Sequence, residues 1–163
     1  LGVAPAALGL ERDAHGRPRL DPRLEADTSW SHSGEGLLLA LARGARVGVD
    51  LERIRPRPRA LELAARYFTA DETAWLRAPP ADAGRDTAFL RLWCAKEAVL
   101  KAHGRGLAFG LHRLGFAEQH GGLVLVAADP ALGPVDAWRL REIVPHPGYV
   151  AALAWQPLPR MRA

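Results

Sequence analysis

The chain has 163 residues, 48% hydrophobic and 25% charged, which is typical of one globular domain or two small fused halves and excludes a disordered protein. No apolar run approaches the roughly 18 residues that cross a bilayer, so we expect no transmembrane helix. A single cysteine, Cys94, excludes an internal disulfide and a cysteine-rich metal site, and it favours a cytoplasmic location.

The net charge of +4 comes from 20 arginines and only two lysines on the positive side. On its own it admits nucleic acid, an anionic cofactor or an acidic protein as the partner. Both lysines, Lys96 and Lys101, fall in the stretch 93–101 (WCAKEAVLK). Because a compact ammonium and a planar guanidinium contact phosphate differently, a phosphate site can require lysine. Chance is the alternative reason for this pairing.

The first half of the chain is expected to contain loops and then two strands. Residues 1–28 are predicted to be loop-like, since glycine and proline interrupt a weak apolar pattern. Residues 37–42 predict a buried strand, and a turn leads to a second strand over 46–52. Residues 53–59 (RIRPRPR) form a basic connector broken by prolines.

Helices are expected in the middle of the chain. The pattern predicts one helix over 60–67 and another that begins at Thr69, where Glu72 has capping-box spacing. The clearest helix runs from about 86 to 103 and stops at Gly104.

The last third predicts two hairpins. One joins residues 114–119 to 123–128, and the other joins 137–144 to 149–155. Strands, then helices, then antiparallel strands indicate an α+β fold.

Carboxylates occur at spacings that could bring them together. Asp50 and Glu52 lie two residues apart in a predicted strand, so they share a face. Trp93, Glu97 and Lys101 are spaced by four and share a helix stripe. Packing that face on that stripe would gather three carboxylates and an ammonium.

Hard oxygen ligands without a cysteine or histidine cluster suit Mg²⁺, which completes its shell with water and substrate phosphates. Lys101 beside the metal would then contact a phosphate. In the alternative interpretation, Glu97 and Lys101 are an ordinary surface pair, and Asp50 and Glu52 mark a strand that leaves the core. The spacing alone leaves both interpretations open.

Two of these segments, 48–52 (GVDLE) and 93–101 (WCAKEAVLK), resemble the signature motifs of the 4′-phosphopantetheinyl transferases. Residues 16–20 (GRPRL) are similar to the family's Gly-Lys-Pro segment, with Arg17 in place of lysine. Residues 29–33 (SWSHS) are similar to its Asn-x-Ser-His-Ser segment. The longer type that activates surfactin synthetase matches better than the short type that serves fatty-acid carrier proteins.

The resemblance implies transfer of phosphopantetheine from coenzyme A to a serine of an apo acyl or peptidyl carrier protein, releasing adenosine 3′,5′-bisphosphate. It also implies two pseudo-twofold related α+β halves, with antiparallel strands packed on a long helix and coenzyme A between the halves. We expect residues 1–46 to be a shortened N-terminal half that contacts the nucleotide. Residues 47–163 would form the C-terminal half with the metal site.

The family's metal site and chemistry carry over to four positions. The resemblance implies that Asp50, Glu52 and Glu97 hold Mg²⁺ against the pyrophosphate. Asp50, Glu97 and Lys101 would be catalytic, with Lys101 neutralising a phosphate oxygen. Glu97 is the candidate base for the proton of the attacking serine.

Contacts to coenzyme A carry over to five residues. Lys101 and Lys96 would lie near the phosphates. Arg17, Ser31 and His32 would bind the phosphates and the adenine-ribose end.

Alternatives to the enzyme come from the basic character of the chain. The connector 53–59 is interpreted as a solvated loop, as a docking surface for an acidic carrier protein, or as a nucleic-acid contact. No nucleic-acid-binding motif accompanies it, which disfavours the last of these. A non-catalytic module that binds coenzyme A is the other alternative to the transferase.

Overall fold

The computed structural model describes residues 2, 4, 8–14, 16–78 and 82–158 of the chain. Its regular elements are nine strands and three α-helices, joined by turns and short 3-10 segments, within these described residues. They are β1 (Leu10–Arg12), β2 (Pro18–Leu20), β3 (Ala26–Ser33), β4 (Gly36–Arg43), β5 (Ala45–Arg53), α1 (Ala60–Tyr67), α2 (Ala70–Arg77), α3 (Asp82–His103), β6 (Leu114–Gln119), β7 (Gly122–Ala128), β8 (Arg139–Ile143) and β9 (Tyr149–Pro157). The fold is α+β, as predicted.

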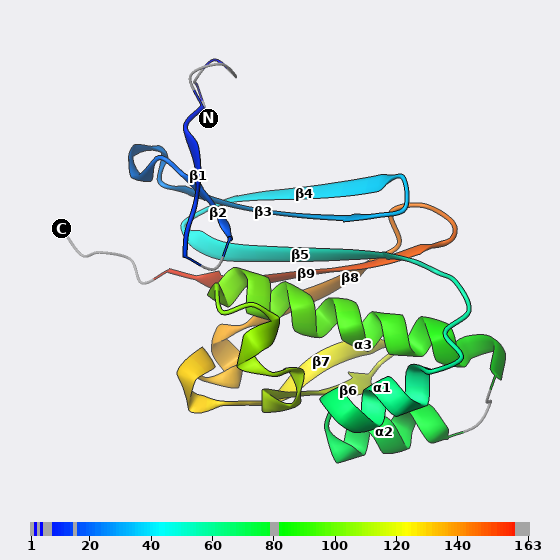
Figure 1. Cartoon of the computed structure of the whole chain (residues 1–163). Coiled ribbons are helices and arrows are strands. Elements are labelled where there is room, and N and C mark those ends of the chain that lie inside the picture. The colour runs from blue at the N-terminus through cyan, green and yellow to red at the C-terminus, as the bar shows by residue number, and fades with distance from the viewer. Residues whose placement is uncertain (1, 3, 5–7, 15, 79–81, 159–163) are drawn as a thin grey trace.

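Helix α3 is the centre of the molecule. Figure 1 shows the antiparallel sheet β5–β9–β8 and the β3–β4 ribbon on one side of α3, and the β6–β7 ribbon with α1 and α2 on the other. Because α3 is covered on both sides, most of its second half is buried, including Ala98, Val99 and Leu100. This double coverage means that neighbouring residues of α3 face different layers.

Strand β5 packs on α3 at backbone distance. A Cβ atom at Gly48 would lie 2.0 Å from the carbonyl oxygen of Ala98 and 2.4 Å from the amide nitrogen of Ala102. Glycine at position 48 and alanine at the two facing positions permit this approach. The approach brings the even-numbered face of β5, which carries Asp50 and Glu52, towards α3.

Most predicted elements are confirmed, but the strand expected to be buried over 37–42 is not: in β4, Leu37, Leu39 and Leu41 are more than half exposed. The helix over 60–67 has the expected limits, and Thr69 and Glu72 form a capping box at the start of α2. The long helix begins at Asp82, four residues before the predicted start. Both predicted hairpins are present, as β6–β7 and β8–β9.

The prediction of a loop-like start was wrong in part. Leu10–Arg12 pairs with Pro18–Leu20, and β3 pairs with β4 from Ala26 to Ser33. Strands β1, β2 and β3 contain few apolar residues and no apolar alternation, so the hydrophobic pattern of the sequence does not predict them. Pairing with a neighbouring strand stabilises them, and strand propensity, which is a local property, does not include that pairing.

The second face of the central sheet, which carries Val47, Val49 and Leu153, lies away from α3. A groove of about 680 Å³ runs between β4 and this face, lined mainly by aliphatic side chains such as Leu39, Val47, Val49 and Leu153. None of the predicted site residues lines it. Among the described residues, no helix is long and apolar enough to cross a membrane.

Candidate functional site

Asp50 is buried where β5 faces α3. Its Oδ1 accepts hydrogen bonds from the hydroxyl of Ser31 at 2.8 Å and from the ammonium of Lys101 at 2.7 Å. Its Oδ2 is buried and lacks a hydrogen bond of ordinary geometry, although the buried thiol of Cys94 lies against the Asp50 carboxylate. A buried carboxylate oxygen without an ordinary hydrogen bond is unfavourable, so this atom marks a position for a cation or a donor from a ligand.

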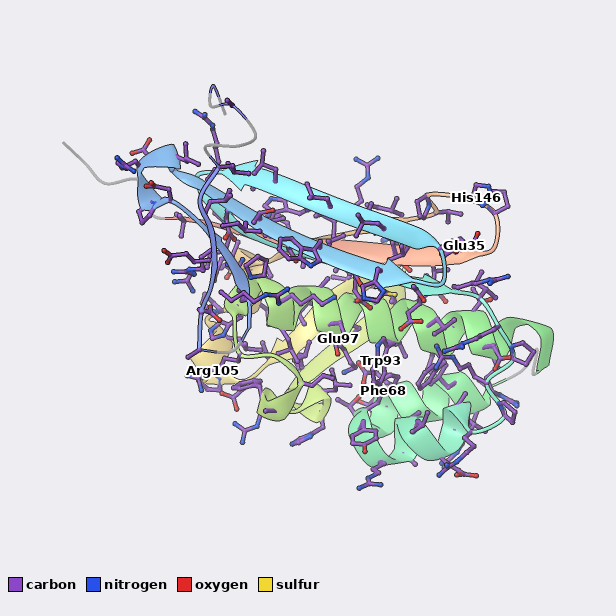
Figure 2. All side chains as sticks on the ribbon, turned by 45° about the horizontal axis from the view of Figure 1, so that its top comes forward. Glu35, Phe68, Trp93, Glu97, Arg105 and His146 are labelled. Carbon is purple, nitrogen blue, oxygen red and sulfur yellow. The ribbon has the colours of Figure 1, made fainter. Side chains whose placement is uncertain are left out.

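Glu97 lies on α3, one turn before Lys101, and its side chain is only 7% exposed. Burial raises its pKa to about 7, the negative charge of Asp50 adds to the rise, and Lys101 partly opposes it. Figure 2 shows Glu97 near Trp93, with Phe68 beyond. A carboxyl group with a pKa near neutrality can accept and release a proton under ordinary conditions.

Glu52 is the third carboxylate of the cluster and is half-buried. Its Oε2 accepts hydrogen bonds from the hydroxyl of Ser33 at 3.2 Å and from the guanidinium of Arg57 at 3.1 Å. Its charge contributes to the raised pKa of Glu97.

The oxygen donors suit Mg²⁺, and the Oδ2 of Asp50, which lacks an ordinary hydrogen bond, is where a cation would fit. As they stand, the described residues contain no group of three histidine, cysteine or acidic side chains close enough to hold a metal. The structure thus brings Asp50, Glu52 and Glu97 into one region but not into a complete ligand set. A metal would need its remaining ligands from water and substrate.

Lys101 reaches the cluster, as the helix stripe predicts. Its ammonium donates to Asp50 and also to the carbonyl oxygen of Val49 at 3.1 Å. The side chain is 28% exposed, so it can also meet a ligand from solvent. It is the cation at this site that is best placed to contact a phosphate.

Lys96 does not reach the cluster, which corrects the expectation that it lies near the phosphates. Its ammonium is fully buried against β6, where it pairs with Glu72 at 2.8 Å and donates to the carbonyl oxygens of Leu111 and Leu114. Consecutive helix residues point about 100° apart, so Lys96 and Glu97 cannot both face β5.

Arg17 is also engaged within the protein. Its guanidinium forms a bidentate ion pair with Asp27 and donates to the carbonyl oxygens of Lys101 at 2.7 Å and Val47 at 3.0 Å. It thereby ties the β1–β2 hairpin to the end of α3 and to β5. The structure thus gives Arg17 a structural role, because every guanidinium nitrogen has a partner within the protein. Its contact to coenzyme A stays a prediction.

Ser31 and His32 point in different directions, although the motif makes them neighbours. Ser31 is buried and donates to Asp50, whereas His32 is exposed. Successive strand residues alternate between faces, so only one of the two can approach β5.

Three further residues have roles that the sequence does not reveal: Ser33 and Arg57 hold Glu52, and Asp27 pairs with Arg17. No alternation in β3 could have revealed these roles, because Thr28 and His32 are polar as well as Asp27, Ser29, Ser31 and Ser33. Only the packing of β3 on β5 distinguishes the two faces of this strand.

The raised pKa of Glu97 predicts how stability depends on pH in metal-free buffer. The folded chain holds this proton up to about pH 7, whereas an unfolded glutamate releases it near 4.3, so stability falls as pH rises through this interval. Glu97→Gln cannot ionise and escapes the loss. Urea unfolding in EDTA should show this variant more stable than the wild type at pH 8, by up to about 3 kcal/mol, with a smaller difference at pH 5. A difference that grows towards low pH would contradict the assignment.

Comparisons with known proteins identify the origin of these motifs. A family model described as the 4′-phosphopantetheinyl transferase superfamily matches residues 46–154. The chain is 36% identical to the 4′-phosphopantetheinyl transferase HetI of Nostoc over 96% of its own length and 66% of that protein. It is 28% identical to the 4′-phosphopantetheinyl transferase Sfp of Bacillus subtilis, over 85% of this chain and 59% of Sfp. It therefore spans somewhat less than two thirds of these relatives.

A solved structure has the same fold. The holo-[acyl-carrier-protein] synthase of Thermotoga maritima superimposes with a TM-score of 0.54 at 20% identity, covering 69% of this chain and 63% of that one. At this level of identity the likeness concerns the fold alone.

Proposed function

The chain belongs to the 4′-phosphopantetheinyl transferase superfamily, and we propose that it transfers the 4′-phosphopantetheine group of coenzyme A to a serine of an apo acyl or peptidyl carrier protein. Adenosine 3′,5′-bisphosphate would be the second product. The proposal rests mainly on one observation, the direct contact between the two signature segments 48–52 and 93–101. Asp50 of the first accepts a hydrogen bond from Lys101 of the second and keeps one buried oxygen without an ordinary hydrogen bond.

The proposed reaction needs no nucleophile from this chain, because the attacking hydroxyl belongs to the carrier. The serine oxygen forms a bond to the β-phosphorus of coenzyme A, and the bond from that phosphorus to the bridging pyrophosphate oxygen breaks. Glu97, with its pKa near 7, would take the serine proton. Lys101 would stabilise the negative charge on the phosphates.

The donor set around Asp50 fits Mg²⁺, and we propose that Asp50 and Glu97, with Glu52 beside them, would hold it. When bound, Mg²⁺ would neutralise charge on the pyrophosphate and polarise the phosphorus under attack. For coenzyme A itself we propose contacts from Lys101 and the exposed His32.

The connector 53–59 supports an acidic carrier protein as the partner. Arg53, Arg55 and Arg59 are exposed there, directly after Glu52 in the chain. Arginines beside the reaction site would attract an acidic carrier and mainly raise the rate of encounter. Such a reaction would take place in the cytoplasm, which suits the single unpaired cysteine.

The proposal is tested by incubating this chain with an apo carrier protein, coenzyme A and Mg²⁺, and by measuring the intact mass of the carrier. We expect one added phosphopantetheine per carrier, and none with EDTA. Binding of coenzyme A without transfer to any of several carriers would instead indicate a non-catalytic module. Steeply salt-dependent binding to DNA or RNA without coenzyme A binding would indicate a nucleic-acid binder.

A further inference from the structure

The two carboxylates of β5 are held in the same way. Oδ1 of Asp50 accepts from Ser31 and from Lys101, at 2.8 and 2.7 Å. Oε2 of Glu52 accepts from Ser33 and from a cation, Arg57, at 3.2 and 3.1 Å. In both cases a β3 serine and a basic side chain meet on one oxygen of the carboxylate.

The serines are fixed by the way β3 lies against β5. The side-chain oxygens of Asp27, Ser29 and Ser33 each accept a hydrogen bond from a backbone N–H of β5, and each partner lies 20 residues further along the chain. The constant offset means that the strands run parallel and in register, with side chains of β3 taking the place of a backbone partner. Ser31 occupies the remaining position of this series and bonds to Asp50 instead.

We propose that Ser31 and Ser33 are positioning residues that orient Asp50 and Glu52 towards the bound cation; this inference rests on the proposed function. A carboxylate has two equivalent oxygens that exchange by rotation. Two donors on one oxygen prevent this exchange and leave the second oxygen for the ligand. In Asp50 the second oxygen is Oδ2, which is buried and forms no hydrogen bond of ordinary geometry. Outer-shell partners of this kind commonly change metal affinity by 10- to 100-fold.

This role differs from the contact to coenzyme A implied by the family motif for Ser31. The hydroxyl proton of Ser31 is used by Asp50, and its side chain is buried. Arg57 has a related role, because its ion pair with Glu52 helps to hold that carboxylate. The other arginines of the connector are exposed.

The test is calorimetric titration of Mg²⁺ into the chain saturated with coenzyme A, for the wild type and three variants. We expect Ser31→Ala to weaken Mg²⁺ binding at least about tenfold, and Ser33→Ala to weaken it less because Glu52 is more exposed. Ser29→Ala is the matched control, since Ser29 lies buried on the same face of β3 but accepts from the backbone of Val49. It should change Mg²⁺ affinity less than twofold.

Coenzyme A affinity in EDTA and urea unfolding are measured for every variant. Equal weakening of Mg²⁺ binding by Ser29→Ala and Ser31→Ala would overturn the inference, because a loosened strand would then explain both. It would also fail if Ser31→Ala weakened only coenzyme A binding in EDTA, which is the result expected of a phosphate contact. Unchanged Mg²⁺ affinity in Ser31→Ala, with transfer intact in the wild type, would remove the positioning role alone. A wild type that binds coenzyme A but no Mg²⁺ would overturn both the role and the proposed metal chemistry.

Discussion

Glu97→Gln should lower the rate of phosphopantetheine transfer by at least about a thousandfold, equivalent to about 4 kcal/mol of activation free energy. Glutamine has nearly the same shape but can neither take the serine proton nor supply a negative charge to a cation. The native environment already favours the uncharged form of Glu97, because burial raises its pKa to about 7. The variant should therefore stay folded, and initial rates of carrier mass gain measure the loss.

Glu11→Gln is a suitable control, because Glu11 is an exposed carboxylate on β1. This variant should transfer at the wild-type rate. If Glu97→Gln keeps more than a tenth of the wild-type rate, the base lies elsewhere and the role given to Glu97 is wrong.

Lys96→Met should lower the free energy of unfolding by roughly 3–5 kcal/mol. The carboxylate of Glu72 joins three elements, since it accepts from the backbone N–H groups of Thr69 and Phe116 and pairs with Lys96. Without the ammonium, a buried negative charge loses its counter-ion, and the carbonyl oxygens of Leu111 and Leu114 lose a donor. Urea unfolding near neutral pH measures the change.

The other lysine of the motif provides the contrast. Lys101 is 28% exposed, whereas Lys96 is fully buried, so Lys101→Met should cost less stability and affect transfer more. Adding Glu72→Gln to Lys96→Met should recover part of the lost stability, because it removes the uncompensated charge. Equal unfolding free energies for Lys96→Met and the wild type would show that the buried pair does not contribute as argued.

Local signals predicted much of the fold. The capping box at Thr69 and the glycine after His103 depend on a few adjacent residues, and the structure places helix ends at both. The strands β1 to β3 were missed because their partners across the ribbons are not visible in local patterns. The start of α3 was placed four residues late, at a helix end where sequence signals are weak.

The amino-acid sequence alone was enough to locate the two signature segments, the elements from β4 onwards and the spacing that puts Glu97 and Lys101 on one stripe. The tertiary packing sets which way the side chains of adjacent residues in those segments point, and therefore which role each residue has. Lys96 and Glu97 are adjacent, yet one is buried towards β6 and the other lies with Asp50. Ser31 and His32 are adjacent, yet one is buried and the other exposed. Helical rotation and strand alternation separate such neighbours, and only the packing of α3, β5 and β3 settles which of them faces the site.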